Sequence, residues 1–258
     1  MAATAAFGWA ADASAAADKS GTNPINFTND LRIYNEFIWL NTPGDGVQNM
    51  TTVEFRTPFA DGKWQFRVRA RALNFEADLN GDGLDDVDEF GTGDTDFRFL
   101  TVPYLNMKKK MAIAVGIEAV LDTASEAALG AGATSFGPQV FGVFFKPFGG
   151  FWDLIAPAYQ HKFSVEEDRG RAQVHQGLID LFFLKMAKDK QSWMLVDPQA
   201  VIDYENDKEF MLIDMEAGKM LDKYLGTKGH SVYVRPSVGI GSDRPTDGSI
   251  EIGYKIIW

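Results

Sequence analysis

An acidic stretch from Asp78 to Glu89, DLNGDGLDDVDE, has the spacing of a calcium-binding loop. Six carboxylates within twelve residues repel one another unless a cation joins them. We therefore predict a Ca²⁺ ion that stiffens an external loop without catalytic chemistry; the alternative is an acidic, solvated turn. The predicted ligands are Asp78, Asn80, Asp82, Leu84 through its backbone carbonyl, Asp86 through water, and Glu89 with both oxygens.

A second group of chemistry-bearing residues alternates with apolar residues near the start of the chain. If the apolar residues face lipid, the charged ones point inward, and arginines on one side of a pore facing carboxylates across it would create a transverse field. Such a field favours anionic or zwitterionic solutes. The predicted pore-lining residues are Arg32, Arg56, Arg67, Arg69, Arg71 and Arg98, facing Asp30, Glu36, Glu54 and Glu118. The alternative is a salt-bridged interior that conducts nothing.

Catalytic residues are not predicted. The chain has three histidines, His161, His175 and His230, and none has a serine two residues away on the same strand face. No two histidines share the spacing of metal ligands. The enzyme hypothesis, an outer-membrane hydrolase, therefore ranks last.

The charged and apolar residues alternate with a period of two, which is typical of β-strands. Trp64, Phe66 and Val68 are apolar, for example, while Gln65 and Arg67 lie between them and Arg69 follows. Runs of this kind predict twelve strands, near 30–39, 53–59, 64–72, 96–105, 111–121, 135–145, 154–163, 172–186, 192–203, 210–220, 231–240 and 250–258. Residues 178–184 are apolar at almost every position and would also suit a short helix.

Connection lengths separate a membrane barrel from a soluble sandwich. Short connections at 60–63, 106–110, 146–152 and 187–192 alternate with longer ones rich in Gly, Asp and Thr. This alternation is typical of a barrel with short periplasmic turns and longer outer loops. The connection at 221–230 is longer than the pattern requires and that at 204–208 is shorter, so the strand count is least certain there. The fold class is all-β: a single antiparallel, up-and-down transmembrane β-barrel of about twelve strands.

The last strand carries apolar residues at every second place and ends on an aromatic residue. These residues are Ile250, Ile252, Tyr254, Ile256 and Trp258. The pattern resembles the carboxy-terminal insertion signal of Gram-negative outer-membrane proteins, which the barrel-assembly machinery recognises. The resemblance implies a location in the bacterial outer membrane. It also orients the strand: Glu251 and Lys255 would point inward, and Lys255 would continue the row of basic residues that lines the pore. The strand would close the barrel against the strand that begins near Asn29.

Three further segments resemble the phenol-degradation meta-pathway type of outer-membrane protein. They are LIAPAYQH at 154–161, LGAGATSFGPQV at 129–140 and RPSVGIGSDRP at 235–245. Members of that family are presumed transport barrels, and its substrate label is not carried over.

Composition narrows the choice of partners. The chain of 258 residues has 25 Lys and Arg against 36 Asp and Glu, a net charge of -11 that argues against nucleic acid. The long uncharged stretch 127–145 is interrupted by glycines and Pro138, so no transmembrane helix is predicted. The absence of cysteine fits passage through the periplasm. The predicted partners are a lipid bilayer, the barrel-assembly machinery and a small-molecule solute, with the oligomeric state left open.

The first 24 residues are rich in alanine and differ from the rest. Small residues at Ala11, Ala13 and Ala15 are similar to a signal-peptide cleavage region, but a positive start and a strongly apolar core are lacking. We predict a flexible leader or signal remnant at 1–24 and a barrel domain at 25–258. Two functions follow: a selective channel with a calcium-stabilised loop, or a non-conducting barrel that binds a partner through its outer loops.

Overall fold

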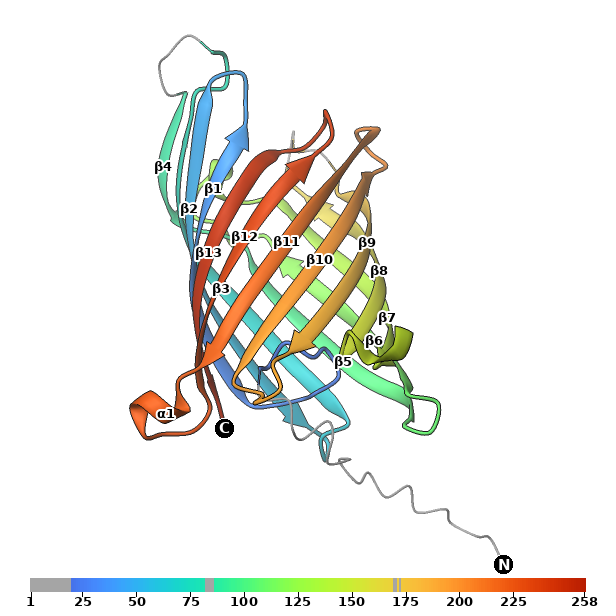
Figure 1. Ribbon diagram of the computed structural model, residues 1–258. Coiled ribbons are helices and arrows are strands. Elements are labelled where there is room, and N and C mark those ends of the chain that lie inside the picture. Colours follow the sequence, from blue (N-terminus) through green and yellow to red (C-terminus); the bar gives the residue numbers. More distant parts are fainter. Residues whose placement is uncertain (1–19, 82–85, 169–170, 172) are drawn as a thin grey trace, which may run out of the picture.

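The protein is a closed β-barrel in the computed structural model, which describes residues 20–81, 86–168, 171 and 173–258 (Figure 1). All pairings between neighbouring strands are antiparallel. The strands are β1 Asp30–Asn41, β2 Asp45–Phe59, β3 Trp64–Ala77, β4 Val87–Thr92, β5 Thr95–Asn106, β6 Met111–Leu121, β7 Ala133–Phe145, β8 Leu154–Glu167, β9 His175–Met186, β10 Ser192–Asp203, β11 Lys208–Met220, β12 His230–Ile240 and β13 Thr246–Ile257. The helical pieces are short: α1 Asp222–Leu225 and the 3₁₀ turns Ala127–Leu129 and Phe148–Gly150. Across the described ranges, no helix is long and apolar enough to span a membrane.

The ring closes where the first strand meets the last. β13 pairs with β1, with Ile257 opposite Asp30, and β2 pairs with β3, which completes the circle. The backbone amide of Trp258 donates a hydrogen bond of 3.0 Å to the carbonyl of Asn29. The final strand therefore closes the barrel as the sequence predicted.

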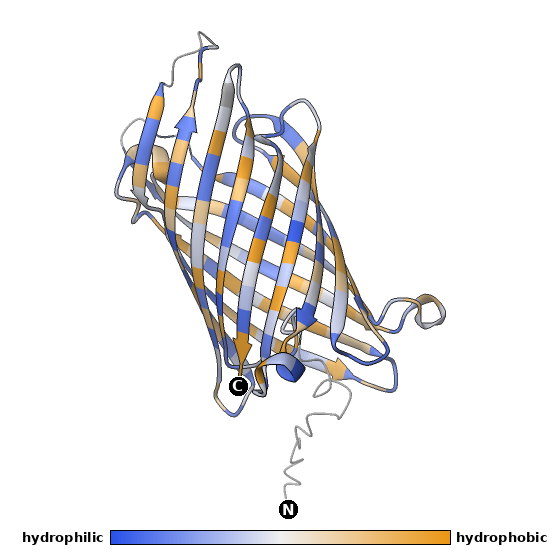
Figure 2. Ribbon diagram, turned by 60° about the vertical axis from the view of Figure 1, so that its left-hand side comes forward, coloured by the Kyte–Doolittle hydropathy of each residue, from blue (hydrophilic) through white to orange (hydrophobic). Residues whose placement is uncertain are grey.

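Alternation decides which side chains face outward. On β6, Ile113, Val115 and Ile117 are exposed on the outer surface, while Ala112 and Ala114 are completely buried. Figure 2 shows the same alternation of apolar and polar residues along the other strands. In water an outer surface of this kind would leave a large apolar area uncovered, so it indicates a lipid surrounding.

One strand was missed in the sequence, within the predicted loop at 77–94. β4 pairs with the upper part of β3, from Ala72 to Ala77, whereas β5 pairs with its lower part, from Trp64 to Arg69. The ring itself has the predicted twelve strands, and β4 is an addition to it. Gly93 and Asp94 separate β4 from β5, and both are buried. The amide of Gly93 donates to the carbonyl of Arg71 at 3.1 Å, which draws this link toward the interior.

The structure decides the secondary structure in the two regions where the sequence left it open. Residues 178–184 belong to strand β9, not to a helix. The long connection after β11 contains α1 and lies at the same end as the carboxy terminus, called the lower end after Figure 1. The strand count therefore holds. The first outer connection is tighter than predicted, because β1 and β2 stay paired as far as Asn41 and Asp45.

The lower half of the barrel interior is filled by apolar side chains. Its members come from β5 to β12 and are Leu100, Val102, Ala112, Ala114, Val143, Leu154, Ala156, Leu184, Trp193, Leu195, Met220 and Tyr233. Ile25 and Phe27, which precede β1, pack against this cluster. Ser20 and Asn23 are buried as well. The segment Ser20–Phe27 therefore lies inside the barrel, although the sequence assigned residues up to 24 to a flexible leader.

Candidate functional site: a lumen with two charged walls

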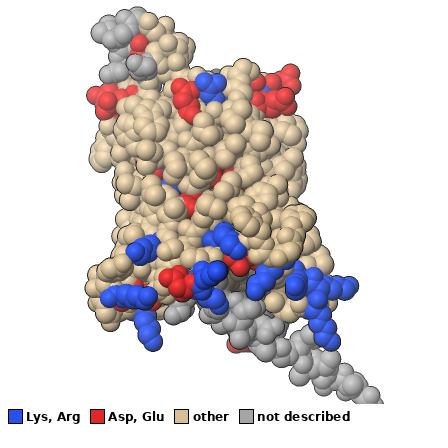
Figure 3. All heavy atoms as spheres, viewed as in Figure 1, with Lys and Arg blue, Asp and Glu red and all other residues tan. Residues whose placement is uncertain are grey.

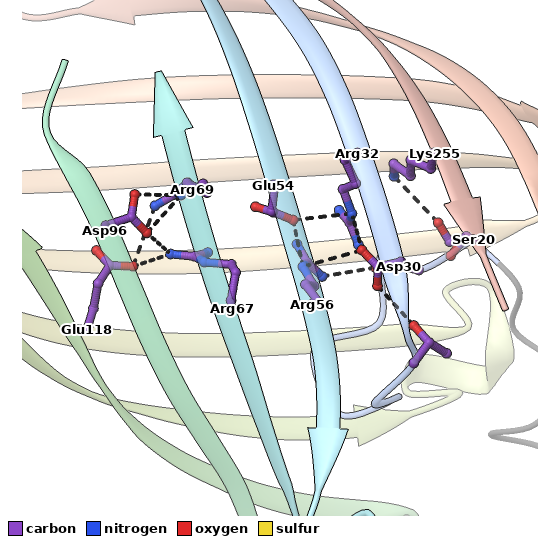
Figure 4. Close-up of polar contacts among 12 residues, drawn as sticks. Ser20, Asp30, Arg32, Glu54, Arg56, Arg67, Arg69, Asp96, Glu118 and Lys255 are labelled. Atoms are coloured by element: carbon purple, nitrogen blue, oxygen red, sulfur yellow. Dashed lines mark hydrogen bonds and ion pairs between the residues drawn. The ribbon is translucent and has the colours of Figure 1, made fainter. Parts of the chain in front are cut away.

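Inward-facing arginines from β2, β3 and β5 form one side of the lumen, called here the basic wall: Arg56, Arg67, Arg69, Arg71 and Arg98. Alternation places Arg67, Arg69 and Arg71 on the same face of β3. Asp96 on β5 contacts all three, at 2.9 Å from Arg67, 2.8 Å from Arg69 and 2.5 Å from Arg71. Figure 4 shows its contacts with Arg67 and Arg69. Glu118 on β6 also pairs with Arg67, and it lies 3.5 Å from Arg69. Much of the positive charge is thus balanced by direct neighbours.

A second ion-pair cluster lies beside the first, on β1 and β2. Arg32 lies 2.8 Å from Asp30 and 3.3 Å from Glu54, while Arg56 lies 2.6 Å from Glu54. Arg32 and Arg56 also donate hydrogen bonds to the backbone carbonyl of Gly21, at 2.5 and 3.3 Å. This cluster therefore ties the segment Ser20–Phe27 to the barrel wall.

These contacts correct part of the predicted arrangement. The sequence placed Asp30, Glu54 and Glu118 across the lumen from the arginines. Asp30 and Glu54 instead bind arginines on the same or the neighbouring strand, and Glu118 binds Arg67 two strands away in the ring. Adjacent strands in register bring inward residues side by side, as with Glu54 and Arg69. Glu36 does stand apart from the basic wall, accepting a 2.7 Å hydrogen bond from Ser249.

Two inward cations remain without a partner. Among the described residues, neither Arg98 on β5 nor Lys162 on β8 forms a side-chain hydrogen bond or an ion pair. Arg98 stands in register between Arg67 on β3 and Glu118 on β6, yet Glu118 pairs with Arg67 and Arg69 instead.

The opposite side of the lumen carries three aspartates that the sequence did not indicate, called here the acidic wall: Asp180 on β9, Asp197 on β10 and Asp214 on β11. In the ring order β10 lies six places from β3, which puts this wall across from the basic wall. Asp197 and Asp214 are register partners, and Gln199 donates to both, at 3.2 and 3.3 Å. Asp180 and Asp197 hydrogen-bond to each other, and their buried Oδ1 atoms accept no hydrogen bond from any other described residue. The inward position of each aspartate in the alternation of its strand was the only signal in the sequence.

A third cluster closes the lower part of the lumen. Glu216 accepts hydrogen bonds from Trp193 at 2.6 Å and from Lys255 at 3.2 Å, and it also binds Arg235. Lys255 is fully buried, with its Nζ 4.4 Å from the centre of the Tyr233 ring. The sequence had placed Lys255 in a continuation of the basic wall. Its salt bridge to Glu216 instead makes it part of the packed interior.

The upper mouth is narrowed by a connection that folds inward. The turn Ala127–Leu129 buries Leu129 against the barrel, and Arg171 donates to the carbonyls of Ala127 and Gly130 at 2.9 and 2.5 Å. A cavity of about 360 Å³ lies beneath it, with Arg69 and Arg71 on one side and Lys162 on another.

At the rim of this upper mouth, desolvation and the nearby carboxylates Asp168 and Asp94 raise the pKa of Asp122.

The predicted calcium loop lies at the upper end, between β3 and β4. Asp82 and Leu84 lie outside the described residues. Asp86 accepts hydrogen bonds from the amides of Leu79 and Asn80, at 2.8 and 3.1 Å, and Asp78 accepts one from Gly81 at 2.6 Å. Glu89 is exposed on β4. In the part of the loop that is described, no three candidate ligands gather closely enough to hold a metal ion, so the calcium site stays a prediction.

The histidines lie on the outer surface or at its edge. His161 and His175 are in ring contact, with centroids 5.1 Å apart, and both neighbour Tyr204. His230 hydrogen-bonds to the hydroxyl of Tyr254. These contacts are typical of aromatic residues at a membrane interface.

Comparison with solved structures finds outer-membrane barrels. The chain is similar to an outer membrane channel from Pseudomonas putida F1, with a TM-score of 0.68, 11% identity, and coverage of 90% of this chain and 96% of that one. It is also similar to the NanC porin (TM-score 0.56, 10% identity, 88% and 98% covered) and to the beta domain of the Bordetella autotransporter BrkA (TM-score 0.56, 10% identity, 89% and 100% covered). No family model and no curated protein matches the sequence. The likeness shows that the chain has the fold of an outer-membrane β-barrel.

Proposed function

We propose that the protein is a narrow channel of the bacterial outer membrane for small zwitterionic or anionic solutes. The observation that carries this proposal is the pair of opposed walls, with Arg98 unpaired on one side and Asp197 incompletely bonded on the other. Charges that only hold an interior together are normally neutralised by their neighbours. Charges that line a passage can instead take water or a solute as their partner.

The two walls also account for the choice of solute. A cationic side facing an anionic side produces a field across the lumen, in which a molecule with both charges aligns. Two inward cations near the upper mouth, Arg71 and Lys162, border the same cavity although their strands lie four places apart in the ring. The anionic group of a small solute that enters there contacts both cations at once.

The outer surface and the last strand support the location. Ile250, Ile252 and Trp258 are exposed, whereas Glu251 and Lys255 are buried. This is the inside-out division that a lipid surrounding requires. Assembly by the barrel-assembly machinery is part of the same proposal, and so is a Ca²⁺ ion that stiffens the loop from Asp78 to Glu89.

A second candidate function rests on the lower half of the interior. The apolar cluster and the segment Ser20–Phe27 occupy the space through which a solute would leave. A barrel closed in this way would conduct nothing and would act through its outer loops. Removal of residues 1–24 separates the two functions, because it should raise the conductance of a partly obstructed channel and should leave a solid barrel silent.

The direct experiment is single-channel recording in a planar lipid bilayer. The purified full chain should give small, discrete conductance steps, since the passage is narrow. If neither the full chain nor the shortened one conducts at strong applied voltage, the channel proposal is wrong. A mock preparation from cells lacking the protein serves as the control for contaminating porins.

A further inference from the structure

A second cavity lies at the lower end of the barrel and belongs to neither charged wall. Its volume is about 530 Å³, within the range of sites for small ligands. It is bordered by the connections β5–β6, β7–β8 and β9–β10 and by Asn23. The cavity therefore opens at the mouth opposite the calcium loop.

The floor of this cavity is apolar. Leu154 and Leu184 are register partners on β8 and β9, each only 2% exposed, and they face inward as part of the apolar cluster. Phe145 and Met186 pack against the same cluster, and Met107 completes the lining. An apolar floor at an aqueous mouth favours a ligand that covers it, because removing apolar surface from water is favourable.

The rim of the cavity is basic, and its members are Lys110, Lys146, Lys185, Lys188 and Lys190. Lys185 lies 3.6 Å from Asp153, whereas the other four form no ion pair with any described residue. Figure 3 shows lysine and arginine gathered at this end of the visible face. The whole chain has a net charge of -11, so this end of the barrel carries a local excess of positive charge.

Three of the rim lysines also hold an unfavourable backbone conformation. The φ angles of Lys110, Lys146 and Lys190 are 53°, 46° and 55°, in the left-handed region that glycine or asparagine adopts more readily. Ala60, Asp61 and Asp207 have the same conformation in other hairpin turns, so it belongs to the turns, and glycine fits these positions.

We propose that this cavity binds small amphiphilic anions, molecules with one acidic head, a carboxylate or a phosphate, and an apolar body. The body would cover Met107, Phe145 and Met186, the partly exposed apolar side chains of the lining, and the head would lie among the lysines. The same chemistry is offered by two sources, a free amphiphile and the acidic headgroup of a membrane lipid. The site does not depend on conduction, so it stands or falls separately from the channel.

Octanoate is a suitable probe, because it is soluble and has a single carboxylate. The full chain is placed in nanodiscs of phosphatidylcholine and titrated by calorimetry, with empty nanodiscs as the blank. We expect saturable binding of octanoate. Hexanoate, two methylenes shorter, should bind about tenfold more weakly, following about 0.8 kcal/mol for each buried methylene. Octyltrimethylammonium, with the same body and the opposite charge, should not bind.

Variants test the rim without endangering the fold. Lys110→Gly with Lys190→Gly removes two charges and relieves two left-handed residues, so the melting temperature should not fall, while octanoate affinity should drop at least fivefold. The matched control is Lys108→Gln with Lys109→Gln, in the same turn as Lys110 but outside the cavity, and its affinity should not change.

Nanodiscs containing phosphatidylglycerol distinguish the two sources. If this lipid competes with octanoate in the parent chain and not in the glycine variant, a lipid headgroup is the occupant. If it does not compete, the occupant is a free amphiphile. Equal affinity for octanoate in the parent, the glycine variant and the control, or binding of the cationic probe as strongly as octanoate, would overturn the proposal.

Discussion

Arg67 and Arg98 are register partners on β3 and β5, yet only Arg67 has carboxylate partners, Asp96 and Glu118. Two like charges side by side repel, and one of them is left without compensation. This position of Arg98 does not stabilise the folded barrel. Binding of a solute by Arg98 would explain why the arginine is there.

Replacing Arg98 by Gln should therefore change selectivity more than stability. The free energy of unfolding should stay within about 1 kcal/mol of the parent, because the side chain has no bonded partner to lose. The reversal potential in a salt gradient should move toward that of a cation-selective channel. Lys63→Gln, a change in the turn below the lumen, provides a control that should leave the reversal potential unaltered. A stability loss above about 3 kcal/mol would mean that Arg98 holds the barrel together.

The acidic wall should produce the opposite shift. Asp197→Asn and Asp214→Asn keep the side-chain shape and remove the charge that faces the basic wall. Each change should move the reversal potential toward anion selectivity, and the double variant should move it further. Asp203→Asn, at the upper end of the same strand β10, serves as the comparison. Unchanged selectivity in the double variant would show that these aspartates do not border the path.

Asp96 is expected to behave as a structural residue, in contrast to Arg98. Its carboxylate is fully buried and contacts Arg67, Arg69 and Arg71. Asp96→Asn leaves three arginines with one carboxylate neighbour, Glu118, and breaking a buried pair typically costs about 3–5 kcal/mol. Urea unfolding in liposomes, followed by tryptophan fluorescence, should show a loss in this range. A loss below about 1 kcal/mol would mean that water already compensates these arginines.

The calcium prediction is tested by removing the metal and by changing one ligand. A chelator should lower the melting temperature and should increase protease cleavage between residues 78 and 89, because a bound ion stabilises the folded loop. Glu89→Gln should abolish the response to added Ca²⁺. It is preferred to Asp86→Asn, since Asp86 also accepts hydrogen bonds from the turn amides. Identical melting and cleavage with and without the chelator would refute the site.

Much of the fold could be predicted because a period of two is visible within each strand. The outward Ile113 and inward Ala112 follow from their positions alone, and so does the inward face that carries Arg67 and Arg69. The residues that lie side by side on neighbouring strands could not be predicted. Register brings Glu54 beside Arg69, where the sequence placed them across the lumen.

The parts that were missed depend on contacts between distant residues. Asp180, Asp197 and Asp214 lie on three different strands, and only the closed ring shows that they face the arginines. In the sequence, Ser20 belongs to the alanine-rich leader. In the structure, its carbonyl oxygen accepts a hydrogen bond of 3.5 Å from the ammonium of Lys255, a residue far away along the chain. β4 lies in a stretch whose acidic residues favour a loop.

The most direct test of the channel is the reversal potential of the full chain in a planar bilayer, recorded together with that of Arg98→Gln and Asp197→Asn. The account predicts discrete conductance steps in all three proteins, with the two variants displaced in opposite directions from the parent. Silent bilayers with the full chain and with the chain lacking residues 1–24, or conductance with the same reversal potential in all three proteins, would contradict it.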